Sequence, residues 1–545
     1  MDNPVIETDV LCVGGGIAGL MAAIRAAEQG ARVVVADKAK TSRSGSAGMG
    51  NDHFRCYIPE VHGPDIKPHV ESLLRSPRGS MRSRTFCHTW LERSIEIVKL
   101  WESWGIPMKY QGRYEFAGHG LPGRAITGLK YSGLEQKPIL TRKALDNGAR
   151  ILNRTMIFDL LPEDGAFSAI GMDTREGRML GIRAKKVILG TGLCTRLYPG
   201  PTPAWVFNMA NSPNNTGDGR AMAYRAGAEL ANAELTMRWA GPKFFARCGK
   251  GSWVGVLRDP DGKPVGPFVT EPDRRYGDAA ADVWETLFDD YAKQGKGPVS
   301  MDCSGISDND FDYMMHWMKN EGNASLLDHL AEEGMDIRRH PVEFMTYEMM
   351  FSGGILYKET GETSVKGLYA AGDEFFGAIS CAAVFGWIAG EHAANAAGSE
   401  APPRSAQLNE SMKEKSALFT DIRNRESGAG WQEVNVALQQ IMADYAGAPR
   451  SDTLLTAGLS HLRRLKQKAP SLLMARNPHE LMHCIEVLNL IDLGELLLIA
   501  AAERKETRDR HVRSDYPFTN PLLDKWLIIK SSGGKPLTEW REIKR

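Results

Sequence analysis

Residues 10–38, VLCVGGGIAGLMAAIRAAEQGARVVVADK, decide the fold of this chain. The apolar run at 10–13 predicts a short buried strand, and the alanine-rich segment 17–29 predicts a helix. A second apolar run at 32–36 predicts a second strand, which Asp37 closes. A strand, glycine turn, helix and strand in this order are typical of a dinucleotide-binding fold, with the pyrophosphate at the helix N-terminus.

The glycines of this stretch form the pattern G-x-G-x-x-G. Gly14 suits the tight turn, Gly16 the close approach of a pyrophosphate, and Gly19 the packing of the helix on the strand. Asp37 lies about 20 residues further on, where an acid hydrogen-bonds a ribose hydroxyl. We predict that these four residues bind the cofactor.

Composition describes an ordinary globular protein whose 545 residues are too many for a single core. Lys plus Arg and Asp plus Glu both number 67, so bulk charge points to neither nucleic acid nor a membrane surface. The longest apolar stretch, 488–502, is interrupted by Asn489, Asp492 and Glu495, so we expect no transmembrane segment. The chain starts without a signal-like segment, and we expect a cytoplasmic location.

The eight cysteines are scattered, and no two form C-x-x-C. Zinc and iron–sulfur sites need clustered thiolates, so we expect no metal site in this chain. Buried, reduced cysteines are the simpler interpretation.

Two later strand-like runs also end in glycines: KVILGTGL at 186–193 and VKGLYAAGD at 365–373. A nicotinamide enzyme has no need of the second run, whereas flavoproteins use an acid there at the ribityl or pyrophosphate end of FAD. FAD is therefore the predicted cofactor. The residues that these runs and the loop after Asp37 add to its predicted site are Lys38, Arg43, Ser44, Gly45, Thr191, Gly192, Gly372 and Asp373. Glu374, next in the chain, has the simpler interpretation of a solvated side chain.

The polar region between these runs, rich in glycine, proline and tryptophan, reads as an inserted domain. A linker is expected at 400–404, and helical patterns follow to about 506. The predicted fold class is α/β: a two-dinucleotide-fold, Rossmann-like FAD-binding domain with an inserted capping domain and a C-terminal helical domain. The predicted boundaries are 1–232 and 346–400 for the FAD-binding domain, 233–345 for the capping domain and 401–545 for the helical domain.

Several motifs together resemble the flavoprotein subunits of succinate dehydrogenase, fumarate reductase and adenylylsulfate (APS) reductase. They are TGDG at 216–219, GGI at 353–355, VFG at 384–386, RKETR at 504–508 with His511, and GKPLTEW at 534–540. The resemblance covers nearly the whole chain and implies the same domain order. It also implies that Asp218, in the TGDG block, contacts FAD.

The APS reductase alpha subunit is the nearer match in appearance. The segment 43–45 reads RSG, as in APS reductases, where the succinate enzymes carry RSH with the histidine bonded to flavin. Gly45 offers no nucleophile, so the resemblance implies non-covalent FAD. The segment TGLCTRLY at 191–198 is also similar to the TGGATRLY of APS reductases.

Other positions depart from the succinate enzymes. Met349 stands where they carry an active-site histidine, four residues before the first glycine of GGI. Their HGANRLGANSL block has no counterpart, because residues 373–384 contain no arginine. Their proton-delivering arginine aligns with Cys248, one residue from Arg247. Succinate and fumarate are therefore disfavoured as substrates.

For substrate chemistry we predict four catalytic residues: His119, Arg124, Arg247 and Lys250. The last two lie among Trp239, Phe244, Phe245 and Trp253, where cations suit an anionic substrate and aromatic rings can stack on it. His119 titrates near neutral pH and is the acid–base candidate. The alternatives are a solvated rim for the basic loop and a structural role for His119. Arg508 and His511 have the alternative of tying the helical domain to the rest.

The expected function is that of an FAD-dependent oxidoreductase subunit that acts on a small anionic substrate, with sulfur compounds included. Because the chain lacks a cysteine cluster, its electrons should pass to a separate ferredoxin-like iron–sulfur protein, the equivalent of a beta subunit, in a hetero-oligomer. One alternative is a stand-alone soluble reductase of an activated double bond. The other is a flavin-bearing electron-transfer or assembly subunit without its own substrate.

Overall fold

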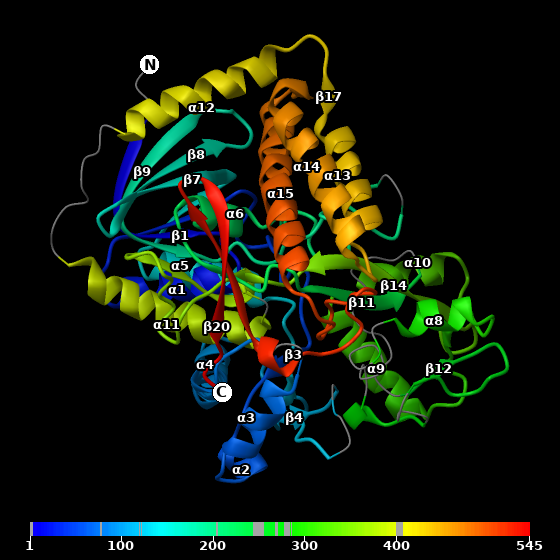
Figure 1. Ribbon diagram of the computed structural model, residues 1–545. Helices are drawn as coiled ribbons and strands as arrows, with labels where there is room; N and C mark the ends of the chain where they lie inside the picture. The colour runs from blue at the N-terminus through cyan, green and yellow to red at the C-terminus, as the bar shows by residue number, and fades with distance from the viewer. Residues whose placement is uncertain are drawn as a thin grey trace.

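The structure of the protein is a computed structural model (Figure 1). It describes residues 4–76, 79–118, 120, 123–202, 205–243, 255–266, 271–276, 284, 286–375, 377–398 and 407–545. All structural statements refer to these residues.

The central sheet is the dinucleotide-binding sheet that the sequence predicts. Four of its strands lie in the order β6–β2–β1–β9, all parallel, and β8 and β7 continue the sheet antiparallel to β9. The late strand β16 also pairs with β9, in parallel, so the run at 365–373 returns to the first fold as predicted. The bounds are β1 Val5–Val13, β2 Val33–Asp37, β6 Arg150–Asn153, β7 Thr155–Glu163, β8 Ala166–Asp173, β9 Met179–Leu189 and β16 Leu368–Ala370.

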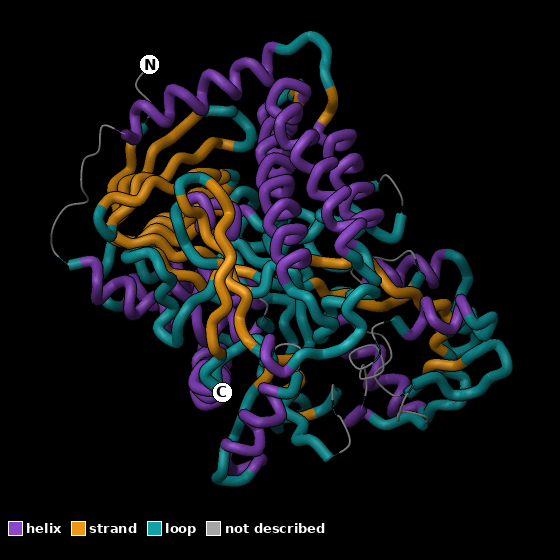
Figure 2. Tube along the Cα trace, in the orientation of Figure 1, coloured by secondary structure: helices purple, strands orange, loops and turns teal. Residues whose placement is uncertain are grey.

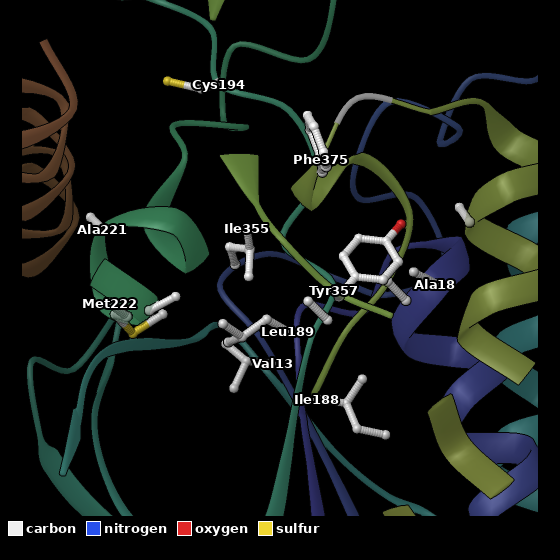
Figure 3. Close-up of a cluster of buried hydrophobic side chains, with 14 of the residues drawn as sticks. Val13, Ala18, Ile188, Leu189, Cys194, Ala221, Met222, Ile355, Tyr357 and Phe375 are labelled. Carbon is white, nitrogen blue, oxygen red and sulfur yellow. The ribbon is translucent and has the colours of Figure 1, made fainter. Parts of the chain in front are cut away.

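Helices α1 (Ile17–Glu28) and α11 (Ile379–Ala397) pack against each other beside this sheet. The close approach depends on glycine, because a Cβ on Gly386 would lie 2.4 Å from the carbonyl oxygen of Ala18. Figure 3 shows the neighbouring core, where Val13 of β1, Ile188 and Leu189 of β9 and Tyr357 converge. The two sequence pieces of the FAD-binding domain therefore share one hydrophobic core.

The capping region has a core of its own. Its four-stranded sheet has the order β11–β14–β13–β12, and Trp317 and Phe344 are buried between this sheet and its helices. The elements are β11 Thr236–Pro242, β12 Leu257–Arg258, α8 Leu287–Lys293, β13 Ser300–Met301, α9 Asp308–Asn320, α10 Ala324–Glu332 and β14 Val342–Phe351. In Figure 1 this green region lies apart from the sheet of β1 and β9. The boundaries at 233 and 345 remain predictions.

The C-terminal region consists of four helices followed by a β-hairpin (Figures 1 and 2). Helix α15, buried along most of its length, packs against α13 and α14, while α12 contacts β8 and β9. The bounds are α12 Gln407–Asn424, α13 Trp431–Ala446, α14 Asp452–Leu472, α15 Pro478–Glu503, β19 Lys525–Ser532 and β20 Lys535–Glu542. None of the helices described has the length and apolar character that a membrane span requires.

The hairpin at the end of the chain is not part of the helix bundle. Strand β19 pairs with β10 (Leu230–Ala231), which in turn pairs with β15 (Gly354–Ile355). The last residues of the predicted helical region therefore return to the FAD-binding domain.

The remaining elements lie between these units. A small antiparallel sheet is formed by β3 (His53–Arg55), β5 (Gly128–Lys130) and β4 (Glu115–Phe116). The helices nearby are α2 Pro59–His62, α3 Lys67–Leu74, α4 Arg84–Ser103, α5 Gln136–Asp146 and α6 Asp218–Arg225, and the short pair β17 Ala429–Gly430 and β18 Leu473–Met474 joins the C-terminal helices.

Candidate active site

A cavity of about 520 Å³ connects the FAD-binding domain with the capping region. We call the part around residues 14–16 and Asp37 its dinucleotide end. The part lined by His53, Trp239, Glu321 and Tyr347 is its cap-side end. The other walls come from the loop 38–51, residues 155–157, 190–193 and 210–218, and the segment 371–382.

Each glycine of the turn has its own geometric reason. Gly14 has φ +95°, and a Cβ there would lie 2.5 Å from the carbonyl oxygen of Gly190. A Cβ on Gly19 would lie 1.8 Å from the oxygen of Gly14, so helix packing excludes any side chain. A Cβ on Gly16 would meet no protein atom closer than 3.5 Å. Because Gly16 lines the cavity, its missing side chain leaves room for a ligand.

The N-terminus of α1 faces this space without a side-chain cap. Gly16 is the N-cap residue, and the first turn of the helix carries no acid. The uncompensated N–H groups and the positive end of the helix dipole therefore suit a pyrophosphate.

Asp37 is buried at the end of β2 and accepts three hydrogen bonds. They come from the backbone N–H of Gly15 at 2.7 Å, that of Ala39 at 2.7 Å and the hydroxyl of Ser44 at 2.9 Å. An ionised carboxylate has about four lone-pair sites, so one remains for a ribose hydroxyl. The donor set thus fits the adenosine part of FAD.

Lys38 and Asp218, both predicted to bind the cofactor, are in the cavity wall but also pair with each other. The Nζ of Lys38 lies 2.7 Å from Asp218 and 2.6 Å from Glu486 of α15. Burial by itself lowers the pKa of Lys38, but these two carboxylates more than offset it and raise the pKa. Glu486 was missed by the sequence reasoning. The available signal was an acid in an almost wholly apolar helix.

The loop after Lys38 places its predicted residues differently. Gly45 has φ +74° and lies beside Gly16, with 3.9 Å between the position of a Cβ and the Cα of Gly16. The Arg43 guanidinium donates to the carbonyl of Leu134 at 3.1 Å and to Glu135 at 3.1 Å. Arg43 thus lines the cavity while its charge is directed to the start of α5.

The second piece of the domain places Thr191, Gly192, Ala371 and Asp373 along the cavity. Gly372 itself has φ +69°, which allows the turn that precedes Asp373. The Asp373 carboxylate accepts the backbone N–H of Gly377 at 3.1 Å, which fixes the turn before α11.

The interpretation of Glu374 as a solvated side chain is wrong. It is fully buried, and its carboxylate accepts the hydroxyl of Thr191 at 2.6 Å. Arg220 of α6 lies beside it and donates to the carbonyls of Gly192 and Gly353. Together these two side chains join segments that are far apart in the sequence, and this explains why the buried pair lies directly behind the cavity.

The predicted catalytic residues are not assembled by the described structure. His119, Arg247 and Lys250 lie outside the described residues. Arg124 is described and exposed, and it is not among the residues that line the cavity. Met349 is buried in the main core rather than in the cavity wall.

Arg508 and His511, matched by the family motif, have structural contacts. The two ring nitrogens of His511 lie 2.9 Å from Arg450 and 2.9 Å from the carbonyl of Arg504, and Arg508 pairs with Glu506. Burial and the neighbouring arginines lower the pKa of His511 well below its usual value. These contacts support the alternative in which both residues tie the C-terminal region together.

Two further acids near the cavity were also missed by the sequence reasoning. Glu348 of β14 accepts the backbone N–H of Ala210, a residue of the cavity wall, at 2.9 Å. Burial raises the pKa of Glu348 to about 7. Glu321 follows α9 and lines the cap-side end. Neither acid stands in a recognisable motif, so a single sequence carries no signal for either.

The fold and cavity define a flavoprotein with a divided dinucleotide-binding domain. The chain matches the FAD binding domain family over residues 9–386, which is more than half of its length. Residues 435–536 match the fumarate reductase flavoprotein C-terminal family. The protein therefore belongs to the succinate dehydrogenase and fumarate reductase flavoprotein family and is an FAD-dependent oxidoreductase, as its motifs indicate.

Known proteins resemble the chain over nearly its whole length. A flavoprotein-family chain of the fumarate reductase (CoM/CoB) from Methanothermobacter marburgensis is 25% identical over 564 residues, covering 97% of this chain and 98% of that protein. The adenylylsulfate reductase of Archaeoglobus fulgidus superimposes with a TM-score of 0.83 at 21% identity, covering 99% and 97% of the two chains. The E. coli quinol fumarate reductase gives 0.82 at 20% identity, with 99% and 97% covered. The structural likenesses confirm the predicted fold.

Proposed function

We propose that this chain is the flavoprotein subunit of an enzyme that exchanges electron pairs between a small anionic substrate and an iron–sulfur protein. One observation carries the proposal. A single cavity runs from the dinucleotide turn to walls supplied by Trp239 and Tyr347 of the capping region. A cofactor held at the turn therefore extends toward a second compartment, where a substrate can meet it. Sulfur oxyanions are included in the proposed class because of the RSG and TGLCTRLY segments.

Bound FAD would supply the two-electron chemistry of the reaction. Gly16 and the N-terminus of α1 would hold its pyrophosphate, and Asp37 would accept a ribose hydroxyl. Asp373 and the backbone at Thr191 would bound its ribityl side. Binding would be non-covalent, since Gly45 has no side chain to form a bond. The capping region would exclude water from the substrate.

The electrons need an acceptor or donor on another chain. The described cysteines are Cys12, Cys56, Cys87, Cys194, Cys303, Cys381 and Cys484, all buried and scattered over the fold. Burial raises the pKa of each of these thiols, for example that of Cys381 to about 11, so they remain protonated at neutral pH. A separate iron–sulfur protein, in a hetero-oligomer, accounts for the relay.

Purification from the native host tests the partner. We expect a second chain rich in C-x-x-C motifs to co-purify, and the reduced flavin to be reoxidised only slowly without it. A chain that remains monomeric and turns over rapidly with one substrate and a diffusible donor would instead support a stand-alone reductase.

The substrate class is tested by anaerobic mixing of the FAD-loaded protein with AMP and sulfite. Bleaching of the oxidised flavin spectrum that requires both compounds would support a sulfur oxyanion coupled to a nucleotide. No spectral change with sulfite at any concentration would mean that anions do not reach the flavin, and would favour a flavin carrier without its own substrate.

A further inference from the structure

The cap-side end of the cavity contains a buried polar cluster that none of the motifs includes. His53, the first residue of β3, lines the cavity, and its Nδ1 lies 2.7 Å from Oδ1 of Asp52. The other oxygen of Asp52 lies 2.6 Å from the Nζ of Lys130 on β5. Strands β3 and β5 pair His53 with Lys130 directly, so the sheet fixes all three residues.

Burial separates the roles of the three groups. The side chains of Asp52 and Lys130 are each only 1% exposed, whereas that of His53 is 16% exposed, toward the cavity. Burial by itself raises the pKa of Asp52, but Lys130 and the hydrogen bond from His53 lower it well below its usual value. Asp52 is therefore ionised and can only accept, so it places the proton on Nδ1 and leaves Nε2 as the nitrogen that titrates.

The capping region contributes the facing group. A carboxylate oxygen of Glu321 lies within 4.8 Å of ligand atoms of both Asp52 and His53. The imidazole thus lies between an acid of the FAD-binding domain and one of the capping region, and both favour its protonated form. Asp52, Lys130 and Glu321 are the charged groups that face it from the loop before β3, from β5 and from the end of α9.

We propose that His53, oriented by Asp52, exchanges the proton that accompanies electron-pair transfer at the FAD site. The inference rests on the proposed function in one respect, namely that the cap-side end is where the reacting part of FAD and the substrate meet. In the reducing direction the substrate receives a hydride from reduced FAD and a proton from Nε2. The Nε2–H bond breaks, a bond from that hydrogen to the substrate forms, and His53 is left neutral. The oxidising direction is the reverse.

The proton is restored when electrons arrive from the iron–sulfur partner. Reduced flavin carries negative charge, which favours protonation of a neighbouring imidazole. His53 should then take up a proton from solvent together with the electron pair. Asp52 is a positioning residue in this scheme and His53 a catalytic one.

The same three ligand types could hold a cation, but Lys130 argues for proton chemistry. Its ammonium already lies 2.6 Å from Asp52, and its position over the ring of Trp317, 5.6 Å from the centroid, is fixed by the capping core. A metal ion would have to displace this buried charge.

The test is spectroelectrochemistry of the FAD-loaded protein without substrate or partner, from about pH 6 to 8, the range in which histidine titrates. The variants are His53→Gln and Asp52→Asn, with His392→Gln, on the exposed side of α11, as control. We expect the wild type and the control to take up one more proton per electron pair than His53→Gln in part of this range. For Asp52→Asn the additional uptake should move to lower pH, because the imidazolium loses its acceptor.

Parallel pH dependences of the midpoint potential in wild type and His53→Gln, with FAD content equal, would overturn the proposal. If Asp52→Asn fails to fold because Lys130 is left unpaired, the His53→Gln comparison decides alone. The measurement needs only bound FAD. Failure to find an iron–sulfur partner would therefore contradict the proposed function without affecting this result.

Discussion

At the dinucleotide end of the cavity, Asp37 and the glycine turn lie within one 29-residue stretch, and backbone N–H groups supply most of the contacts. At the cap-side end, His53, Trp239, Glu321 and Tyr347 come from four separate segments and present side chains. The first end binds a group that is the same in every FAD enzyme. The second must suit a particular substrate, and side chains from different elements can change independently.

The substrate prediction tests this comparison most severely. Among the residues described, the arginine lining the cavity is Arg43, whose guanidinium is directed to Glu135. A C4 dicarboxylate needs fixed cations at both carboxylates. We therefore expect fumarate or succinate turnover at least about 1,000-fold below the ordinary value of about 10 per second.

The assay is anaerobic fumarate reduction with a reduced viologen dye, and succinate oxidation with an artificial acceptor. Flavin reduction by dithionite in the same sample controls for competence. Turnover near about 10 per second would show that the cap-side end binds dicarboxylates after all.

The next largest effect concerns the support behind the dinucleotide end. Glu486 accepts from Lys38, Arg196 and His483, all buried or nearly so. Glu486→Gln leaves these groups without their counter-charge, and we expect a loss of about 3 to 5 kcal/mol in the free energy of unfolding. Urea denaturation measures it, with exposed Glu426→Gln as control. A loss below about 1 kcal/mol would contradict the role assigned to Glu486.

The same group gives a pH dependence. Burial opposes ionisation of Glu486, but Lys38, Arg196 and His483 hold its pKa well below the usual value. The stabilisation is present above the unfolded-state pKa of about 4.3 and is lost as pH falls below it. The difference in stability between wild type and Glu486→Gln should therefore shrink at acid pH.

A third prediction separates folding from cofactor binding at the glycine turn. Gly16→Val adds atoms where the protein leaves space, so we expect a folded protein with FAD affinity reduced about 100-fold, or about 2.7 kcal/mol. Flavin fluorescence measures binding and circular dichroism the fold. Gly305→Val is the control, since its Cβ position has no atom within 4 Å. Unchanged FAD affinity in Gly16→Val would mean that the pyrophosphate does not pass this residue.

The smallest effect concerns Lys137, a buried lysine of α5 that donates to the carbonyl of Gly15. Burial lowers its pKa to about 8. A bound pyrophosphate favours the ammonium form, so FAD affinity should fall as pH rises above about 8. The cofactor-free protein, in contrast, should gain stability from this group between about pH 8 and 10, where the unfolded chain binds the proton more tightly.

Lys137→Met should weaken FAD binding by about tenfold at about pH 7, or about 1.4 kcal/mol, and remove this pH dependence. Exposed Lys99→Met serves as control. Equal pH dependence in wild type and Lys137→Met would show that the buried ammonium does not interact with the cofactor.

The sequence by itself determined the FAD fold. The turn at 14–19, the acid at Asp37 and the late run ending at Asp373 predicted a divided dinucleotide domain, because each motif carries its geometry in consecutive residues. The same local reading failed for Glu374, which looked like a solvated acid. Its burial depends on Arg220 and Thr191, which are 154 and 183 positions away in the chain.

Only the tertiary structure brought His53, Glu321 and Tyr347 to one end of the cavity, and Glu486 behind the other. No spacing in the sequence relates these residues, since they lie on separate elements whose packing is set by two hydrophobic cores. A buried charge is stabilised by whichever groups the fold places around it, and that is a property of the packed chain rather than of any segment.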